Sequence, residues 1–257
     1  MIMYNTCVLL ARTTQTVPHI SLSFFDMLLS IAFVIVAVFS ISAQFSVNST
    51  FKKYSGYVSR RGYTADEVAR QLLINAGIYD VRVEPIRGNL TDHYDPGSKT
   101  LRLSQSVYGS RSIAAIGVAA HETGHAIQHN EGYSPLSLRN TIFPVVNIGS
   151  KLAMPLVFVG CLFYYFNFSL IVLEVAAMLF SFVVIFHLIT LPVEFNASSR
   201  AIALLDRYSF LDGDELNGAK KVLKAAAMTY VAATASSIIQ LLRIIVMIMG
   251  KSGRRRD

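Results

Sequence analysis

Long uncharged stretches of apolar residues constrain the fold of this chain more than any other feature of its sequence. Residues 27–47 contain no Asp, Glu, Lys or Arg. An α-helix needs about 20 consecutive apolar residues to cross the hydrocarbon core of a bilayer, so this stretch is long enough to span it. Lys52 and Lys53 follow closely, as is typical of residues that anchor a span at the membrane surface. We therefore expect residues 24–47 to form an N-terminal membrane anchor.

Two further apolar segments lie in the second half of the chain. Residues 152–191 carry one formal charge, Glu174, and are too long for a single span. We expect a break at Asn167 that makes this segment a helical hairpin. Residues 225–249 are rich in the small residues that let membrane helices pack closely, with Arg243 near one end. The sequence thus predicts a mainly α membrane protein with about four transmembrane or membrane-embedded helices.

The composition agrees with a membrane protein and argues against a nucleic-acid partner. The 257 residues are 53% hydrophobic and 15% charged, whereas a soluble domain carries about 25% charged residues. The net charge of +7 comes from basic residues that flank the apolar spans without interleaved aromatics, which favours a lipid bilayer with anionic headgroups over nucleic acid. Cys7 and Cys161 lie far apart, so we predict no disulfide framework and no cysteine-based zinc site.

The polar residues between the first two apolar segments predict a small mixed structure. Residues 64–67 read as a capping box that opens a helix. Residues 81–84 and 100–103 alternate between apolar and polar positions, as strands do, and the turn residues 95–98 lie between them. We therefore expect these two strands to pair antiparallel as a small β-hairpin.

An H-E-x-x-H motif, His121-Glu122-Thr123-Gly124-His125, lies in a predicted helix over residues 112–128. Histidines four residues apart share one helical face, so both rings can reach a single tetrahedral Zn²⁺. Glu122 is offset by one position and is suited to act as a general base on a zinc-activated water. Gly124 costs about 1 kcal/mol relative to Ala inside a helix, which indicates that another segment approaches closely there.

A catalytic zinc normally takes three protein ligands and leaves one position for water. The residues alone leave several candidates for the third ligand: Glu67, Glu84, Asp92, His93, Asp95, His129, Glu131, Glu174, His187 and Glu194. Successive turns place His129 roughly 12 Å along the helix axis from His121. We therefore interpret His129 as a histidine that interacts favourably with the negative end of the helix dipole.

Glu194 and His187 are the candidates associated with the second apolar segment. An acidic group at the end of a membrane-embedded helix is costly and usually functional. An ordinary ion pair between Glu194 and Arg200 at the membrane surface is the alternative. His187 lies seven residues before Glu194, on the same face, where it can donate a hydrogen bond to substrate or to a zinc ligand, or simply pack.

The chain resembles the bacterial membrane-bound neutral zinc metallopeptidases of the YugP type. The matching stretches are residues 50–55, 90–96, 113–129, 191–198 and 225–233, and the resemblance covers nearly everything from Phe25 to the C-terminus. It implies a zinc-dependent peptidase that is anchored by several helices.

A more distant similarity to the HtpX and CAAX-prenyl protease group, in which two His and a downstream Glu bind zinc, implies roles for individual residues. It assigns His121 and His125 as zinc ligands, Glu122 as the base and Glu194 as the third ligand. That group often has Asp four residues after the ligand Glu, whereas this chain has Ser198. The carboxylate that would orient a ligand is therefore replaced.

These observations predict a zincin-like membrane metallopeptidase with one Zn²⁺ per chain. It would hydrolyse peptide or protein substrates, with a strand near residues 100–104 holding the extended peptide. His93, His129, His187, Ser198 and Arg200 are candidates to support the ligands or the substrate. The sequence specifies no oligomeric state.

Two alternative functions remain open at this point. The first is an intramembrane protease, although only about nine apolar residues precede His121 in its helix, short of the ~20 that a span needs. The second is a non-catalytic membrane scaffold with a metal-stabilised fold. An intact Glu122 argues against it, because a structural metal site needs no base.

We expect one integrated unit over residues 1–257. It comprises the anchor, a polar catalytic segment over residues 48–140, the hairpin over residues 152–191, and a third-ligand segment with a C-terminal helix over residues 192–257. Arg12 splits residues 1–22, which therefore do not read as a cleavable signal peptide.

Basic residues predict the orientation of the chain in a bacterial plasma membrane. The segment after the first span carries Lys52, Lys53, Arg60 and Arg61, whereas the segment before it carries Arg12. The positive-inside rule therefore places the active site in the cytoplasm. The basic residues that follow the predicted hairpin agree with this orientation: Arg200, Arg207, Lys220, Lys221 and Lys224. Lys251 and residues 254–256 contradict this orientation if residues 225–249 cross completely. In that case either the last helix crosses incompletely or the orientation is reversed.

Overall fold

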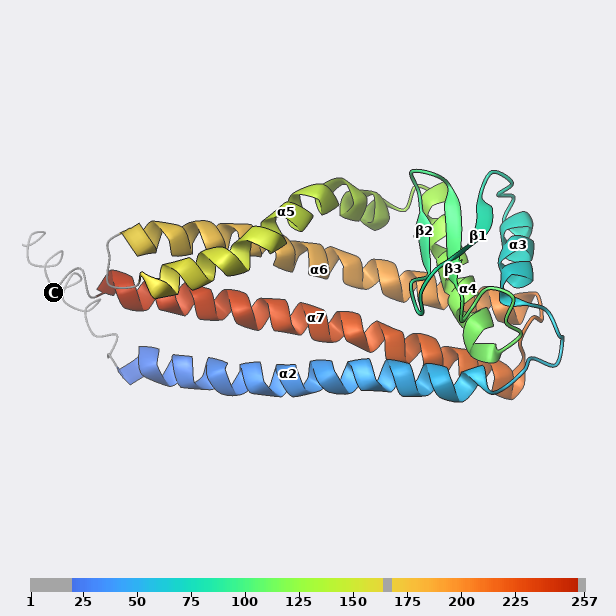
Figure 1. The fold of residues 1–257 in the computed structure, drawn as a ribbon, viewed down its shortest axis with the longest axis horizontal. Helices are drawn as coiled ribbons and strands as arrows, with labels where there is room; N and C mark the ends of the chain where they lie inside the picture. The colour runs from blue at the N-terminus through green and yellow to red at the C-terminus, as the bar shows by residue number, and fades with distance from the viewer. Residues whose placement is uncertain (1–19, 164–167, 254–257) are drawn as a thin grey trace, which may run out of the picture.

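The structure, a computed structural model, describes residues 20–163 and 168–253, with side chains over residues 24–163 and 170–250 (Figure 1). The expectations for Cys7, Arg12, the break at Asn167 and the basic residues 254–256 lie outside the described residues, as does the side chain of Lys251. Most of residues 1–22 lie outside them as well.

Four long helices form the body of the molecule: α2 (Ile20–Ser55), α5 (Ser134–Leu162), α6 (Phe168–Arg207) and α7 (Gly213–Gly253). Each contains a segment long and apolar enough to cross a membrane, which confirms the predicted number. The chain runs in one direction along α2 and α6 and returns along α5 and α7 (Figure 1). The pair α5–α6 therefore brings the chain back to the end of the bundle that it left.

The helices are longer than their apolar cores suggested. We expected a hairpin over residues 152–191, but α5 already begins at Ser134 and α6 continues through Pro192 to Arg207. Apolar stretches mark only the part of a helix that lies in lipid, so the polar turns at its ends were not predicted. Pro192 does not end α6, because neighbouring helices in a membrane bundle tolerate such residues. The internal prolines of α5 accompany its visible bend (Figure 1).

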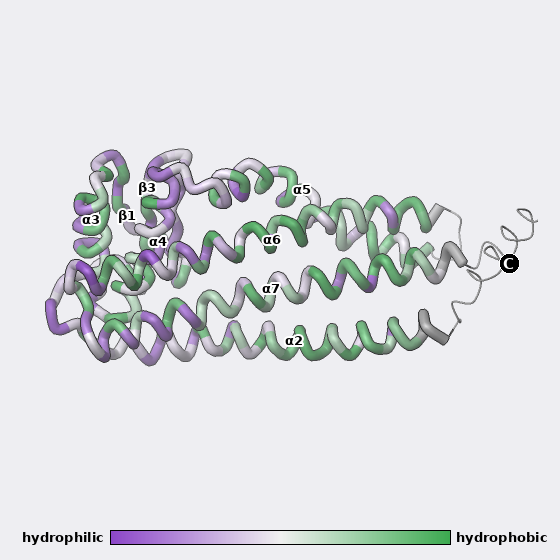
Figure 2. Tube along the Cα trace, turned by 180° about the vertical axis from the view of Figure 1, so that it is seen from behind, coloured by the Kyte–Doolittle hydropathy of each residue, from purple (hydrophilic) through white to green (hydrophobic). Residues whose placement is uncertain are grey.

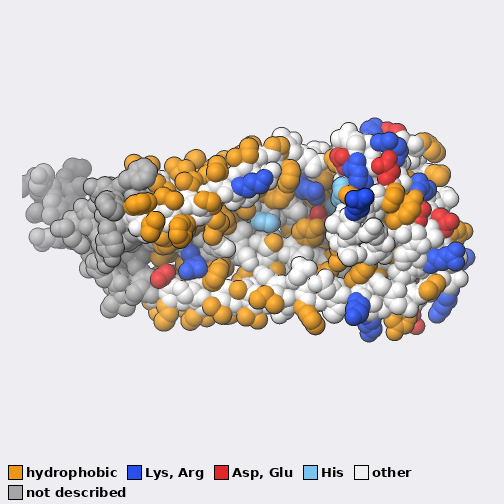
Figure 3. All heavy atoms as spheres, in the orientation of Figure 1, with side chains coloured by type: hydrophobic (Ala, Val, Ile, Leu, Met, Phe, Trp, Pro, Cys, Tyr) orange, Lys and Arg blue, Asp and Glu red, His pale blue; other side chains and the backbone are white. Residues whose placement is uncertain are grey.

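The surface of the bundle divides into an apolar body and a polar end. Figure 2 shows hydrophobic residues along most of the long helices, whereas hydrophilic residues are concentrated, among hydrophobic ones, at the end where α3, α4 and the sheet lie. Hydrophobic side chains cover much of the visible body in Figure 3, while charged groups gather at the polar end. On α2, Ile35 is 63% exposed and Ile41 is 71% exposed. Such a continuous apolar surface is suited to lipid contact, and the protein is a membrane protein.

The polar end contains a short helix and a three-stranded sheet. Helix α3 (Ala65–Asn75) begins with the predicted capping box of Thr64 and Glu67. The strands are β1 (Arg82–Ile86), β2 (His93–Asp95) and β3 (Thr100–Ser104), in the order β1-β3-β2.

A hairpin is present across the predicted turn, but the predicted antiparallel pairing of residues 81–84 with residues 100–103 is wrong. β3 pairs antiparallel with β2 across the predicted turn, whereas it pairs parallel with β1. Alternating apolar residues identify a strand and not its partner, and three-residue β2 is too short to show such an alternation. In this arrangement β2 forms an edge of the sheet and β3 lies in its middle.

Helix α4 (Ile113–Asn130) carries the H-E-x-x-H motif and connects the polar end to the bundle. The side chain of Ser112 caps its first turn by accepting a hydrogen bond from the backbone of Ala115, at 3.2 Å. The apolar first half of α4 is buried, and the helix packs against α3, α6 and α7.

Contacts between α2 and α7 show which residues of these two helices lie side by side. The hydroxyl oxygens of Ser40 and Ser236 lie 3.2 Å apart. The guanidinium of Arg243 lies 4.7 Å from the centre of the Phe33 ring, a cation–π contact that favours a charged side chain on an apolar helix. Because the two helices run antiparallel, residues that follow Ser40 face residues that precede Ser236.

Candidate metal centre

Helices α4 and α6 touch through their backbones at the centre of the motif. A Cβ atom on Gly124 would lie 2.7 Å from the carbonyl oxygen of Ala197, closer than real Cβ contacts allow. Only glycine therefore permits this approach, which accounts for a residue that is otherwise unfavourable inside a helix. The contact presses the histidine face of α4 against the segment of α6 that follows Pro192.

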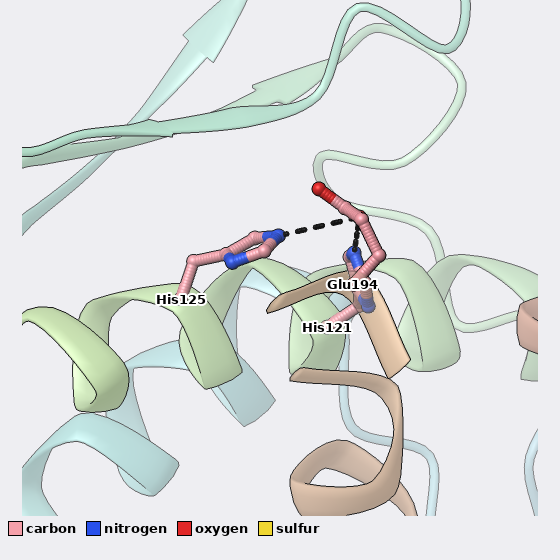
Figure 4. Close-up of side chains that lie close together, drawn as sticks. All are labelled: His121, His125 and Glu194. Atoms are coloured by element: carbon pink, nitrogen blue, oxygen red, sulfur yellow. Dashed lines mark ion pairs between the residues drawn. The ribbon is translucent and has the colours of Figure 1, made fainter. Parts of the chain in front are cut away.

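Three side chains converge across this helix contact (Figure 4). The Nε2 atoms of His121 and His125 lie 3.3 Å and 3.6 Å from Oε2 of Glu194. One nitrogen or oxygen atom from each residue lies within 4.8 Å of the other two. Among the described residues, this is the group of His, Cys, Asp and Glu side chains that can hold a metal ion.

The atoms of this cluster fit a cation such as zinc. Glu194 is 3% exposed, and its Oε2 atom is buried without a hydrogen-bond partner. A buried carboxylate oxygen without a partner is costly, and a cation would remove this cost. Imidazole nitrogens and a carboxylate oxygen are also the ligand types that zinc takes in proteins.

A buried glutamine determines which nitrogen of His125 faces the cluster. The amide nitrogen of Gln128 donates to the carbonyl oxygen of Val193 and to Oδ1 of Asn196, each at 2.9 Å. Its oxygen is thus left to face Nδ1 of His125, at 3.0 Å. Nδ1 must carry the proton, because an amide oxygen only accepts. The lone pair on Nε2 is then available to a metal.

His121 has a comparable partner on α6. The hydroxyl of Ser198 lies 3.1 Å from Nδ1 of His121, at the position where the distantly similar proteases often have Asp. A hydroxyl oxygen can accept a hydrogen bond from Nδ1 and orient the ring in the same way, although without the negative charge. Ser198, four residues after Glu194, thus contacts His121 where an Asp was expected from the resemblance.

The second oxygen of Glu194 pairs with an arginine that sequence reasoning missed. Nη1 of Arg139, on α5, lies 3.2 Å from Oε1 of Glu194. The alternative pairing of Glu194 with Arg200 is wrong, because Arg200 contacts Glu131 at 2.7 Å and Asn196 at 2.8 Å. Arg139 lies before the apolar segment 152–191 in which the helical hairpin was expected, so the sequence patterns did not identify Arg139 as a candidate site residue.

The remaining candidate ligands lie outside the cluster. The carboxylate oxygens of Asp92 accept from the backbone and the hydroxyl of Ser104, at 2.7 Å and 2.9 Å, and burial raises the pKa of Asp92 despite these bonds. Nδ1 of His129 lies 2.8 Å from the hydroxyl of Tyr94. His93 contacts the carbonyl of Thr91, at 2.9 Å. His187 is one of the residues packed along α6, beside Phe186.

Two cavities meet at the cluster. A larger one lies between α2, α4, α6 and α7, and a smaller one lies between β2 and α5. Glu122 is 8% exposed and lines both cavities. Five residues are common to their walls: Asp92, His121, Glu122, Glu194 and Tyr230. A carboxylate that reaches such a junction is placed to exchange a proton with a bound molecule. Tyr230 was not predicted from the sequence.

Comparisons with known proteins agree with this geometry. A protein-family model described as "Putative neutral zinc metallopeptidase" matches residues 29–249. The chain is 52% identical over 188 residues to "Putative membrane protease YugP" of Bacillus subtilis (strain 168), which covers 73% of this chain and 82% of that relative. No solved structure matches the chain. The family match includes α4 and the segment of α6 that faces it.

Proposed function

Because the chain belongs to the family of neutral zinc metallopeptidases, we propose that it is a membrane endopeptidase in which His121, His125 and Glu194 hold one zinc ion. The observation that carries this proposal is the convergence of the two Nε2 atoms on a buried carboxylate oxygen that has no hydrogen-bond partner. Two nitrogens and one oxygen form the ligand set of several catalytic zinc sites.

Glu122 acts as the general base in the proposed reaction. Zinc would supply a Lewis acid that polarises the scissile carbonyl and makes a water molecule acidic near neutral pH. Glu122 accepts a proton from this water as the oxygen attacks the carbonyl carbon. It then delivers the proton to the amine nitrogen as the peptide bond breaks. Water is consumed, and a carboxylic acid and an amine are released.

We propose that β2 holds the backbone of the substrate. The expected site at residues 100–104 cannot do so, because β3 is hydrogen-bonded to strands on both sides. β2 has an unpaired outer edge in the described sheet, and His93 and Tyr94 line the smaller cavity beside the cluster. An extended peptide that adds to this edge would pass Glu122.

The depth of the cluster favours cleavage at the membrane surface. Residues 27–47 are long enough, at about 1.5 Å per residue, to cover the ~30 Å hydrocarbon core. Val47 lies near the edge of that core, and it lines the larger cavity together with Gln44 and Tyr230. These observations support a site at the boundary of the apolar body. It supports a protease that cuts beside the membrane over one that cuts at the middle of a span.

The test of peptidase activity is cleavage of a soluble peptide library by the purified protein in detergent. We expect new chain ends, identified by mass spectrometry, in the sample that contains zinc and not after chelation. Protein that holds zinc and cleaves neither peptides nor unfolded protein would favour a non-catalytic scaffold instead.

We further propose that the polar end faces the cytoplasm of a bacterial plasma membrane. A groove of about 820 Å³ between α2 and α7 lies at this end, and its walls include five basic residues: Lys53, Arg60, Lys220, Lys221 and Lys224. The positive-inside rule favours the cytoplasm for such a cluster. Helix α7 runs unbroken to the opposite end of the bundle, so its end at Gly253 would lie outside, and the basic residues 254–256 of the sequence count against this orientation. The larger basic cluster is expected to decide the orientation.

Cysteine labelling tests this orientation. In a Cys7→Ser, Cys161→Ser background, we expect Arg60→Cys to react with a membrane-impermeant maleimide only after the cells are permeabilised. Arg254→Cys, in the basic run that follows α7 in the sequence, should react in intact cells. Labelling of residue 60 from outside would refute a cytoplasmic site.

A further inference from the structure

The larger cavity beside the cluster is mainly apolar and measures about 260 Å³. It ends at His121, Glu122 and Glu194, so whatever occupies it lies next to the proposed reaction centre. Its apolar walls come from the ends of α2 and α7, from α4 and from the loop before β2, and they include Val47, Phe51, Leu90, Val118, Ala226 and Ala227.

The volume of this cavity suits a single bulky side chain. A buried apolar cavity of about 150 Å³ accommodates a benzene molecule, whereas pockets for drug-sized ligands span about 300–1,000 Å³. Ala226 and Ala227 contribute little volume to the walls, and longer side chains at these positions would reach into the cavity. The cavity is therefore too small for a whole lipid and large enough for a Leu, Met or Phe side chain.

The smaller cavity on the other side of the cluster has a different character. It measures about 120 Å³, and its walls include Arg139, Asn140 and His93 beside the edge strand β2. A peptide that crosses Glu122 would thus meet polar groups on one flank and apolar groups on the other. The two flanks of the scissile bond are not equivalent.

We propose that the apolar cavity binds a large apolar side chain directly beside the scissile bond. The occupant is a Leu, Met or Phe residue of a polypeptide substrate presented at the membrane surface. This inference rests on the proposed peptidase function and adds a substrate class to it. The cavity is lined by residues of the metal cluster, so its occupant must belong to the molecule that is cleaved. The cavity also lies at the edge of the apolar body, where a polypeptide at the membrane surface can reach it.

The proposal predicts a preference that can be measured. One methylene in an apolar pocket changes kcat/KM by about 10–200-fold. Peptides with Leu or Phe at the flanking position should therefore be cleaved at least about tenfold more efficiently than their Ala analogues. The preference should appear on one flank only, because the other cavity is smaller and polar.

Two opposite changes of wall volume provide the test. Ala226→Leu should fill the cavity and lower the Leu-to-Ala ratio of kcat/KM by about tenfold or more. Val47→Ala should enlarge it and shift the preference from Leu toward Phe. Ala235→Leu is the matched control, because this half-buried alanine lies further along α7 and outside the cavity wall. It should leave the ratio unchanged.

Peptide binding to the Glu122→Gln protein provides a readout that does not depend on turnover. Leu peptides should bind more tightly than Ala peptides, and adding Ala226→Leu should remove the difference. Cleavage without any flanking preference, or equal loss for all peptides in Ala226→Leu, would overturn this inference and leave the peptidase function standing. Selective binding without cleavage by the wild type would overturn the peptidase function and retain the apolar binding site. Absence of both would overturn both.

Discussion

Glu194→Ala is expected to empty the metal site and to reduce peptide cleavage to background. Changes to residues that merely orient a zinc ligand cost about 10–100-fold in metal affinity, and loss of a ligand should cost more. The variant also leaves the guanidinium of Arg139, now 3.2 Å from Glu194, without its partner next to two histidines. Zinc per chain after gel filtration in detergent, measured by mass spectrometry, should fall well below one.

Two control variants make this result specific. Glu174→Ala removes an exposed carboxylate from the same helix and should keep both zinc and activity. His93→Ala changes a cavity residue outside the cluster and should affect the rate more than the zinc content. If His93→Ala alone emptied the site while Glu194→Ala retained zinc, the proposed ligand set would be wrong.

Glu122→Gln should retain zinc and lose turnover. The amide has nearly the same shape as the carboxylate, so the junction of the two cavities should keep its form. It cannot accept a proton from water, however, and general acid–base catalysis of this kind contributes about 10²–10⁴-fold in rate. Steady-state cleavage and metal content, measured on the same preparation, check the prediction.

A loss smaller than tenfold in Glu122→Gln would assign the proton transfer to another group. Asp92 is the neighbour to examine, because it lines both cavities with Glu122. Both of its oxygens already accept hydrogen bonds from Ser104, so we expect Asp92→Asn to affect the rate less than Glu122→Gln does.

The local part of the site could be predicted from the sequence. Residues four apart on a helix share a face regardless of what surrounds them, so the spacing of His121 and His125 was informative by itself. Gly124 was a further local signal, and the contact with Ala197 explains it. The membrane character of the long helices likewise follows from their apolar length.

The residue patterns alone did not single out the long-range part of the site, and Glu194 was expected as a ligand only from the resemblance to other proteases. Glu194 reaches the histidines only because α6 continues through Pro192 and docks against Gly124, and periodicity within one helix carries no information about such docking. Arg139 could not be predicted for the same reason, since it depends on how α5 lies beside α6. The pairing of β3 with two strands was also not predicted, because an alternating apolar pattern indicates a strand but does not indicate which strand it pairs with.

The most direct test of the whole account is a zinc titration of chelator-treated wild-type protein in which bound metal and peptide cleavage are followed together. We predict that activity returns in proportion to bound zinc and saturates at one equivalent per chain, while Glu194→Ala regains neither. Cleavage by the zinc-free protein, or stoichiometric zinc binding without any cleavage, would contradict a zinc peptidase built on His121, His125 and Glu194.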